Sequence, residues 1–118
     1  MCLEDHINTL EEILSDLKEH YLANEKPENK RDPEFFQYVK EQTNPVFKEI
    51  EQWYQKAKAF VQNRSVSVHP QQIESTAENL RLLLLHSYYM DARKKRYMEL
   101  FQSVTYVFDM LKRDLSTY

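Results

Sequence analysis

Residues 3–23 read LEDHINTLEEILSDLKEHYLA, and this stretch decides the fold class. Its apolar residues recur at alternating steps of four and three: Leu3, Ile7, Leu10, Leu14, Leu17 and Tyr21. That spacing places them on one stripe of an α-helix, which Ile13 widens. Acidic side chains fill the opposite face, as is usual for a helix surface in water. The pattern therefore predicts an amphipathic helix over residues 3–23.

Three further stretches with the same spacing predict helices over residues 33–62, 70–88 and 92–115. The second has a clear start, because Asp32 suits an N-cap and Pro33 suits the first helical position. Its apolar stripe consists of Phe36, Val39, Thr43, Val46, Ile50, Trp53, Ala57 and Phe60. The stripe keeps its phase through Pro45, which removes one backbone donor, so we predict one helix kinked near Pro45 rather than two helices.

The other boundaries follow from proline and aspartate. Pro70 opens the third helix, and Asp91 is expected to cap the N-terminus of the fourth. Short connections favour antiparallel neighbours. There is no glycine in 118 residues and no alternation of period two, so a β-sheet is not indicated. The sequence predicts an all-α protein in which residues 1–118 form a single antiparallel up-down-up-down four-helix bundle.

The composition limits the functional classes. Hydrophobic residues make up 42% and charged residues 30%, as in soluble globular proteins. The lone thiol of Cys2 suits a reducing compartment, and no apolar stretch approaches the roughly 20 residues of a membrane span, so we expect a cytoplasmic protein with no membrane partner. The absence of glycine excludes the usual phosphate-binding loops and the nucleophile elbow.

The histidines raise the question of a metal site. No Glu-x-x-His occurs and no two histidines stand three or four apart, so a ferritin-like centre is not indicated and no cofactor is predicted. In an up-down bundle, however, His20, His86 and Asp91 fall at one end. They are the candidates for an alternative function as a metal-dependent enzyme. Ordinary surface histidines are the simpler interpretation.

The basic run Arg93, Lys94, Lys95 and Arg96 opens the fourth predicted helix. Cations there oppose the helix dipole, at a cost of up to about 1 kcal/mol each when exposed. Two interpretations follow. The run can form ion pairs within the protein, since residues 1–29 hold eight acidic and two basic residues, or it can simply be solvated on an exposed face. Alternatively it can bind an anionic partner such as a phosphate, an acidic peptide or RNA.

Aromatic residues beside the stripes are the candidates for a protein contact. Phe47, Tyr54 and Val61 follow one another seven apart on the second helix, and Tyr88 and Tyr89 end the third. They either broaden the core or form an exposed patch of the kind that marks a protein partner. With no catalytic set recognisable, the first functional hypothesis is a non-enzymatic protein-interaction module, a monomer or weak homodimer. Anion or RNA binding is the alternative.

Three segments of the C-terminal half resemble a known family. They are ESTAENLR (residues 74–81), HSYYMDARKKRY (residues 86–97) and LFQSVTY (residues 100–106). They resemble the YppE-like family of small bacterial proteins, a domain of unknown function. The resemblance implies a cytoplasmic four-helix bundle of low-GC Gram-positive bacteria. It implies no activity, cofactor or catalytic residue.

Overall fold

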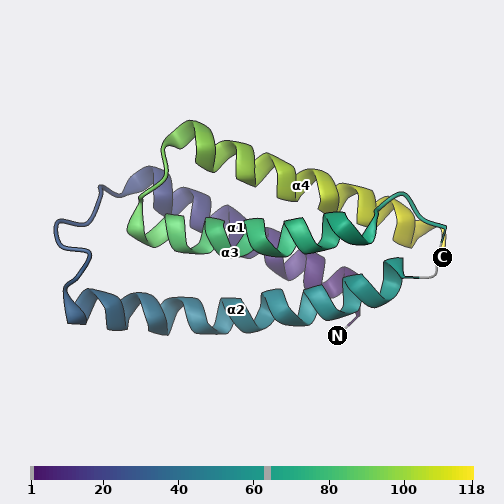
Figure 1. The fold of residues 1–118 in the computed structure, drawn as a ribbon, viewed down its shortest axis with the longest axis horizontal. Helices are drawn as coiled ribbons and strands as arrows, with labels where there is room; N and C mark the ends of the chain where they lie inside the picture. The colour runs from purple at the N-terminus through teal and green to yellow at the C-terminus, as the bar shows by residue number, and fades with distance from the viewer. Residues whose placement is uncertain (1, 63–64) are drawn as a thin grey trace.

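The computed structural model describes residues 2–62 and 65–118 and contains four helices in them (Figure 1). Their bounds are α1 Leu3–Ala23, α2 Pro33–Val61, α3 Pro70–Tyr89 and α4 Lys94–Ser116. The four predicted helices are therefore confirmed, with ends that differ by at most two residues. The predicted connection over residues 62–69 includes residues 63–64, which lie outside the described part.

The starts of α2 and α3 follow from their caps. Asp32 accepts a hydrogen bond from the backbone N–H of Glu34 at 3.0 Å, and Pro33 occupies the first turn. His69 caps α3 by accepting from the backbone N–H of Gln71 at 3.1 Å. These side chains satisfy donors that the first turn of a helix leaves without partners.

α2 runs through Pro45 without interruption. The expectation of one helix rather than two is therefore confirmed. The missing donor of Pro45 leaves one backbone bond unmade, but the apolar stripe on both sides remains available for packing. Tertiary contacts of that stripe outweigh the local propensity for a break.

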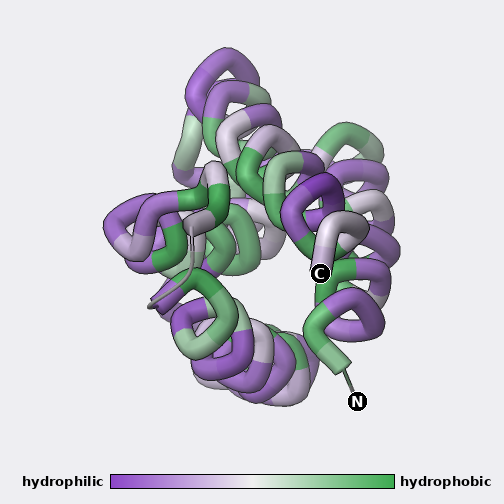
Figure 2. The backbone as a smooth tube through the Cα atoms, turned by 90° about the vertical axis from the view of Figure 1, so that its right-hand side faces the viewer, coloured by the Kyte–Doolittle hydropathy of each residue, from purple (hydrophilic) through white to green (hydrophobic). Residues whose placement is uncertain are grey.

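Consecutive helices run antiparallel, as the sequence predicts, and form an elongated bundle of 48 × 26 × 21 Å. α1 and α3 each pack against the other three helices, whereas α2 and α4 make no close backbone contact in the described residues. α2 and α4 thus occupy opposite corners of the bundle. Figure 2 looks along the helices and shows green, hydrophobic stretches alternating with purple, hydrophilic ones along each helix.

The core is continuous and rich in large side chains. Trp53, Tyr97 and Phe108 are fully buried. The rings of Trp53 and Phe108 meet edge to face at 5.4 Å, so they connect the two helices whose backbones stay apart. In the described residues the indole N–H of Trp53 is buried without a hydrogen-bond partner, which costs part of the free energy gained by burying the ring.

Two expectations about packing need correction. Phe36 belongs to the predicted apolar stripe but is 57% exposed. Asp91 does not cap α4, because α4 begins at Lys94 with Arg93 as its N-cap. Both errors lie at the same end of the bundle, where α2 and α4 begin.

Candidate functional site

The basic run at the start of α4 is exposed and forms no ion pair with the residues that the structure describes. Arg93, Lys94, Lys95 and Arg96 are all exposed, and none forms an ion pair within the residues that the structure describes. The acidic face of α1 does pair with α4, but through Lys112, whose Nζ lies 2.5 Å from a carboxylate oxygen of Glu11. The described residues therefore show no ion pair for the basic run, and both solvation of the four cations and binding of an anion stay predictions.

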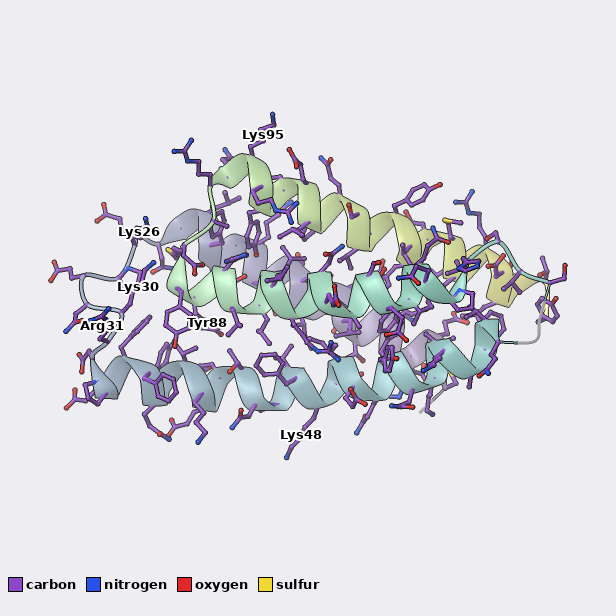
Figure 3. The ribbon with its side chains drawn as sticks, in the orientation of Figure 1. Lys26, Lys30, Arg31, Lys48, Tyr88 and Lys95 are labelled. Carbon is purple, nitrogen blue, oxygen red and sulfur yellow. The ribbon has the colours of Figure 1, made fainter. Side chains whose placement is uncertain are left out.

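The charges of the α4 start extend to a neighbouring loop. Figure 3 shows Lys95 pointing outward at the end of the bundle that also carries Lys26, Lys30 and Arg31 from the α1–α2 connection. Lys26 and Lys94 line the same shallow hollow, together with Tyr21. The side chain of the N-cap residue Arg93 accepts no hydrogen bond from the backbone N–H groups in the first turn of α4.

The carboxylate of Asp91 pairs with a histidine side chain and does not cap α4. Its Oδ1 lies 2.5 Å from Nδ1 of His86, five residues earlier. Partial burial opposes ionisation of Asp91, but hydrogen bonds from His86 and from its own backbone outweigh it, and nearby Lys30 adds to them. The pKa of Asp91 is therefore lowered from its usual value of 3.8. This pair closes the turn between α3 and α4.

His20 does not join that pair. It lies 3.3 Å from the side-chain amide of Asn24 and packs its ring at 4.9 Å against Tyr88. Within residues 2–62 and 65–118, no three histidine, cysteine, aspartate or glutamate side chains are grouped closely enough to hold a metal ion. The three candidates His20, His86 and Asp91 thus share an end of the bundle without forming a ligand set.

The predicted interaction row on α2 divides between core and surface. Val61 is only 3% exposed and belongs to the core, so it offers nothing to a partner. Phe47 and Tyr54 are partly buried against the core. The Tyr54 hydroxyl donates to Glu74 at 2.5 Å, and Lys58 lies 5.5 Å from the ring centre, so polar groups of the chain itself cover the outer edge of Tyr54.

Tyr88 and Tyr89 fix the C-terminal end of α3 to the start of α2. Tyr89 meets Phe35 edge to face at 5.6 Å, and Tyr88 meets Tyr38 at 6.1 Å with the rings 74° apart. Burial, and secondarily Tyr38, raises the pKa of Tyr88 above its usual 10. Both residues are half-buried, and Figure 3 shows Tyr88 between α3 and the start of α2.

A groove opens beside these tyrosines, between α1, α2 and α3. It consists of two adjoining hollows of about 400 and 270 Å³ that share His20, Tyr38 and Tyr88. Asp16 lines the larger hollow and Glu25 the smaller one. We call this feature the Tyr38–Tyr88 groove. Its size falls within the range of small-ligand and side-chain pockets.

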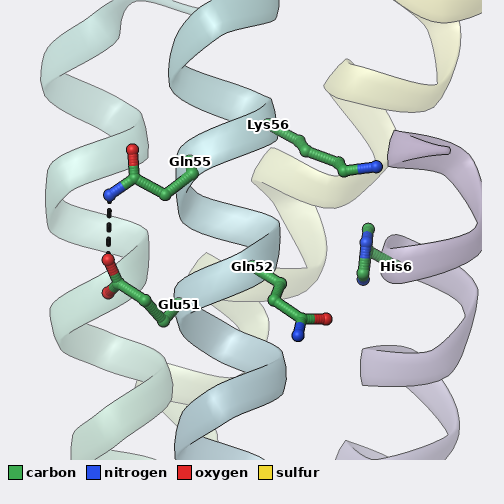
Figure 4. A pocket seen from close by; sticks show the side chains of 5 residues that line it. All are labelled: His6, Glu51, Gln52, Gln55 and Lys56. Carbon is green, nitrogen blue, oxygen red and sulfur yellow. Dashed lines mark hydrogen bonds between the residues drawn. The ribbon is translucent and has the colours of Figure 1, made fainter. Parts of the chain in front are cut away.

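Another hollow, of about 410 Å³, lies near His6 (Figure 4). Lys56 and Gln52 point toward His6, whereas Glu51 and Gln55 turn away from it and hydrogen-bond to each other at 2.8 Å. His6 itself is buried, and its Nδ1 lies 2.6 Å from Glu49. Lys56 and Gln52 therefore face the buried imidazole of His6 across this hollow, while Glu51 and Gln55 pair with each other.

The sequence interpretation passed over two features of these sites. His6 stands three residues after Leu3 and four before Leu10, so its burial was readable from helical spacing. Tyr38 lies off the apolar stripe, so helical spacing also predicts its exposure. Their partners Glu49 and Tyr88 lie on other segments, and helical periodicity says nothing of such pairings.

The fold and these sites define a four-helix-bundle protein whose polar groups form no recognisable catalytic set in the described residues. The model of the bacterial domain of unknown function DUF1798 matches residues 7–115, and the chain belongs to that family. No match was found among curated proteins. The resemblance noted in the sequence is thereby confirmed.

A solved structure supports the same fold. The crystal structure of protein YppE from Bacillus subtilis matches with a TM-score of 0.83, covering 98% of this chain and 93% of that one. The two sequences are 23% identical, so the match bears on the fold alone. None of the helices in residues 2–62 and 65–118 combines the length and apolar character that a bilayer crossing needs.

Proposed function

We propose that this chain is a non-enzymatic protein-interaction module that binds its partner where α2 begins. The observation that carries the proposal is the exposure of Phe36, at 57%, and of Tyr38, at 46%. Covering apolar surface gains about 25 cal/mol per Å², so a partner would be stabilised by contact with these rings. Aromatic residues are also the side chains most enriched in protein interfaces.

The neighbouring end of α3 supports the same location. Leu82 and Leu85 are 39% and 36% exposed, and Tyr89 is half-buried beside Phe35. Leu82 and Leu85 stand three residues apart and share a face of α3, whereas Phe36 and Tyr38 stand two apart and point to different flanks of α2. Of the predicted contacts, Tyr88 and Tyr89 lie at this end, and Phe47 and Tyr54 lie further along α2.

Comparative affinity capture tests the proposal. Wild-type protein, Phe36→Ser and the matched control Gln37→Ser are used as baits in lysate of the native bacterium, and captured proteins are quantified by mass spectrometry. Gln37 is the exposed neighbour of Phe36 on the polar face of α2. We expect a partner that Gln37→Ser retains and Phe36→Ser loses. A capture profile that is the same for all three baits would contradict the proposal.

Anion binding by the start of α4 is the second candidate function. What supports it is the exposure of four adjacent cations, Arg93 to Arg96, that form no ion pair in the described residues. Their mutual repulsion and their position at the positive end of α4 both disfavour the folded state without an anion. An anion bound there would relieve both effects.

Fluorescence anisotropy with a labelled single-stranded RNA tests this candidate. Binding should weaken steeply with salt, and the double variant Lys94→Gln/Lys95→Gln should reduce both affinity and salt dependence. The double variant Lys40→Gln/Lys48→Gln removes two exposed cations from α2 and controls for net charge. No binding at low salt, or an equal loss in both variants, would rule out a site at the α4 start.

A further inference from the structure

The Tyr38–Tyr88 groove has carboxylates but no positive counter-charge from lysine or arginine. Asp16 lines one hollow and Glu25 the other, while neither hollow is lined by lysine or arginine. Neither carboxylate forms an ion pair among the described residues. The groove therefore differs in charge from the basic start of α4 at the same end of the bundle.

The aromatic rings of the groove add a second attraction for cations. Tyr38 and Tyr88 stand 74° apart with centres 6.1 Å from each other, so they form a corner rather than a closed stack. Tyr38 is 46% exposed, which leaves ring surface open to a ligand. The face of a tyrosine ring attracts a cation within about 6 Å, by about 0.5–2 kcal/mol depending on desolvation.

The size of the groove limits what can enter it. Hollows of about 400 and 270 Å³ admit one extended side chain or a small molecule, not a helix or strand of a partner. The floor of the larger hollow includes Leu17 and Val46, which suit a methylene stem. A ligand with an apolar stem and a cationic head matches this combination.

We infer that the Tyr38–Tyr88 groove accepts an arginine side chain of the protein partner. The planar guanidinium stacks on aromatic rings and hydrogen-bonds to a carboxylate through two parallel N–H groups, which a lysine ammonium does not do. Asp16 is the carboxylate that receives it, and Tyr38 and Tyr88 are the rings beside it. The inference rests on the proposed function and assigns its partner an arginine anchor at the same end of α2 as Phe36.

NMR titration of the ¹⁵N-labelled protein with N-acetylarginine amide tests the inference. Saturable shifts should appear at backbone amides of residues 13–20, 38–44, 46 and 88, and N-acetylcitrulline amide, a neutral analogue of the same shape, should produce none. The variant Asp16→Asn should weaken binding roughly tenfold or more, as expected for loss of a charged hydrogen-bond partner. Asp109→Asn, at an exposed aspartate on α4, should leave binding unchanged.

The outcomes separate this inference from the proposed function. Equal shifts with the arginine and citrulline probes, no saturable shifts, or equal weakening by Asp16→Asn and Asp109→Asn would each overturn the arginine site. Phe36 does not line the groove, so Phe36→Ser should bind the arginine probe as the wild type does. If arginine binds but Phe36→Ser captures the same proteins as wild type, the proposed interface is wrong and the groove stands.

Discussion

The two halves of α2 have the same helical pattern and very different surroundings. After Pro45 the stripe is well buried, and its buried members are Ile50, Trp53 and Ala57. Before Pro45 only Val39 and Thr43 are buried, while Phe36 and Tyr38 are exposed. Periodicity therefore specifies which face of a helix can be buried, but a neighbouring element decides whether it is.

The first half of α2 lacks a packing neighbour because α3 ends beside it. Phe35 packs against Tyr89, which is the last residue of α3, so α3 offers no further turn beyond this level. α4 begins on the far side of the bundle and makes no close backbone contact with α2 in the described part of the chain. The first turns of α2 thus extend to the limit of the core.

The largest expected effect is the loss of the core ring in the second half. Trp53→Ala should lower the free energy of unfolding by about 3–5 kcal/mol, because it removes a fully buried ring and leaves a cavity beside Phe108. Urea unfolding followed by circular dichroism measures the change. An effect below about 1 kcal/mol, the range of ordinary substitutions, would mean that the two halves of α2 do not differ as described.

Restoring the backbone donor between the halves should stabilise the protein. Pro45→Ala supplies the N–H that can hydrogen-bond to the carbonyl oxygen of Glu41. Replacing a proline by alanine in a helix interior is worth up to about 3 kcal/mol. Greater freedom of the unfolded chain offsets about 0.4–1 kcal/mol of that gain. We therefore expect a net increase of about 2 kcal/mol, measured by urea unfolding. A decrease would show that the packing of α2 depends on the proline.

The comparison also explains how far the sequence could predict the fold. The four helices, their antiparallel order and the continuity of α2 follow from apolar spacing and from local start signals at Asp32, Pro33 and Pro70. The exposure of Phe36 could not be predicted in this way, because it depends on where α3 ends in space. The capping role expected of Asp91 failed because His86 takes its carboxylate.

The candidate sites were predictable only in part. The cations at Arg93–Arg96 can be recognised in the sequence as a charge run. That they form no ion pair with the described part of the chain depends on where the acidic side chains of α1 lie, which the sequence does not show. The Tyr38–Tyr88 groove combines residues from three helices, so no spacing along the chain indicates it. The sequence shows which residues are available for a site, but not which residues of other helices lie beside them.

Alkaline pH should destabilise the tightly packed contact between α1 and α4 at this end of the bundle. Tyr97 is fully buried, stacks on Tyr21 at 3.9 Å and hydrogen-bonds to Ser87 at 2.6 Å. Burial raises the pKa of Tyr97 above its usual 10, although the Ser87 bond opposes the shift. The folded state then holds a proton that the unfolded state loses first, so stability is complete below pH 10 and falls as pH rises through the folded pKa.

Urea unfolding between pH 8 and pH 11 measures this dependence. Tyr97→Phe should flatten the decline, because it removes the buried phenol. Tyr106→Phe, at a tyrosine that is 60% exposed, should leave the decline as in wild type. If both variants decline as wild type does, Tyr97 is not a group that controls alkaline stability.

The smallest expected effect on stability belongs to Phe36, and it is the sharpest test of the comparison. Phe36→Ser should change the free energy of unfolding by no more than about 0.5 kcal/mol, because an exposed side chain loses little packing when it is shortened. The same substitution should abolish partner capture if the start of α2 is the interface. A residue that matters for binding and not for folding separates interface from core, whereas a loss of several kcal/mol would place Phe36 in the core after all.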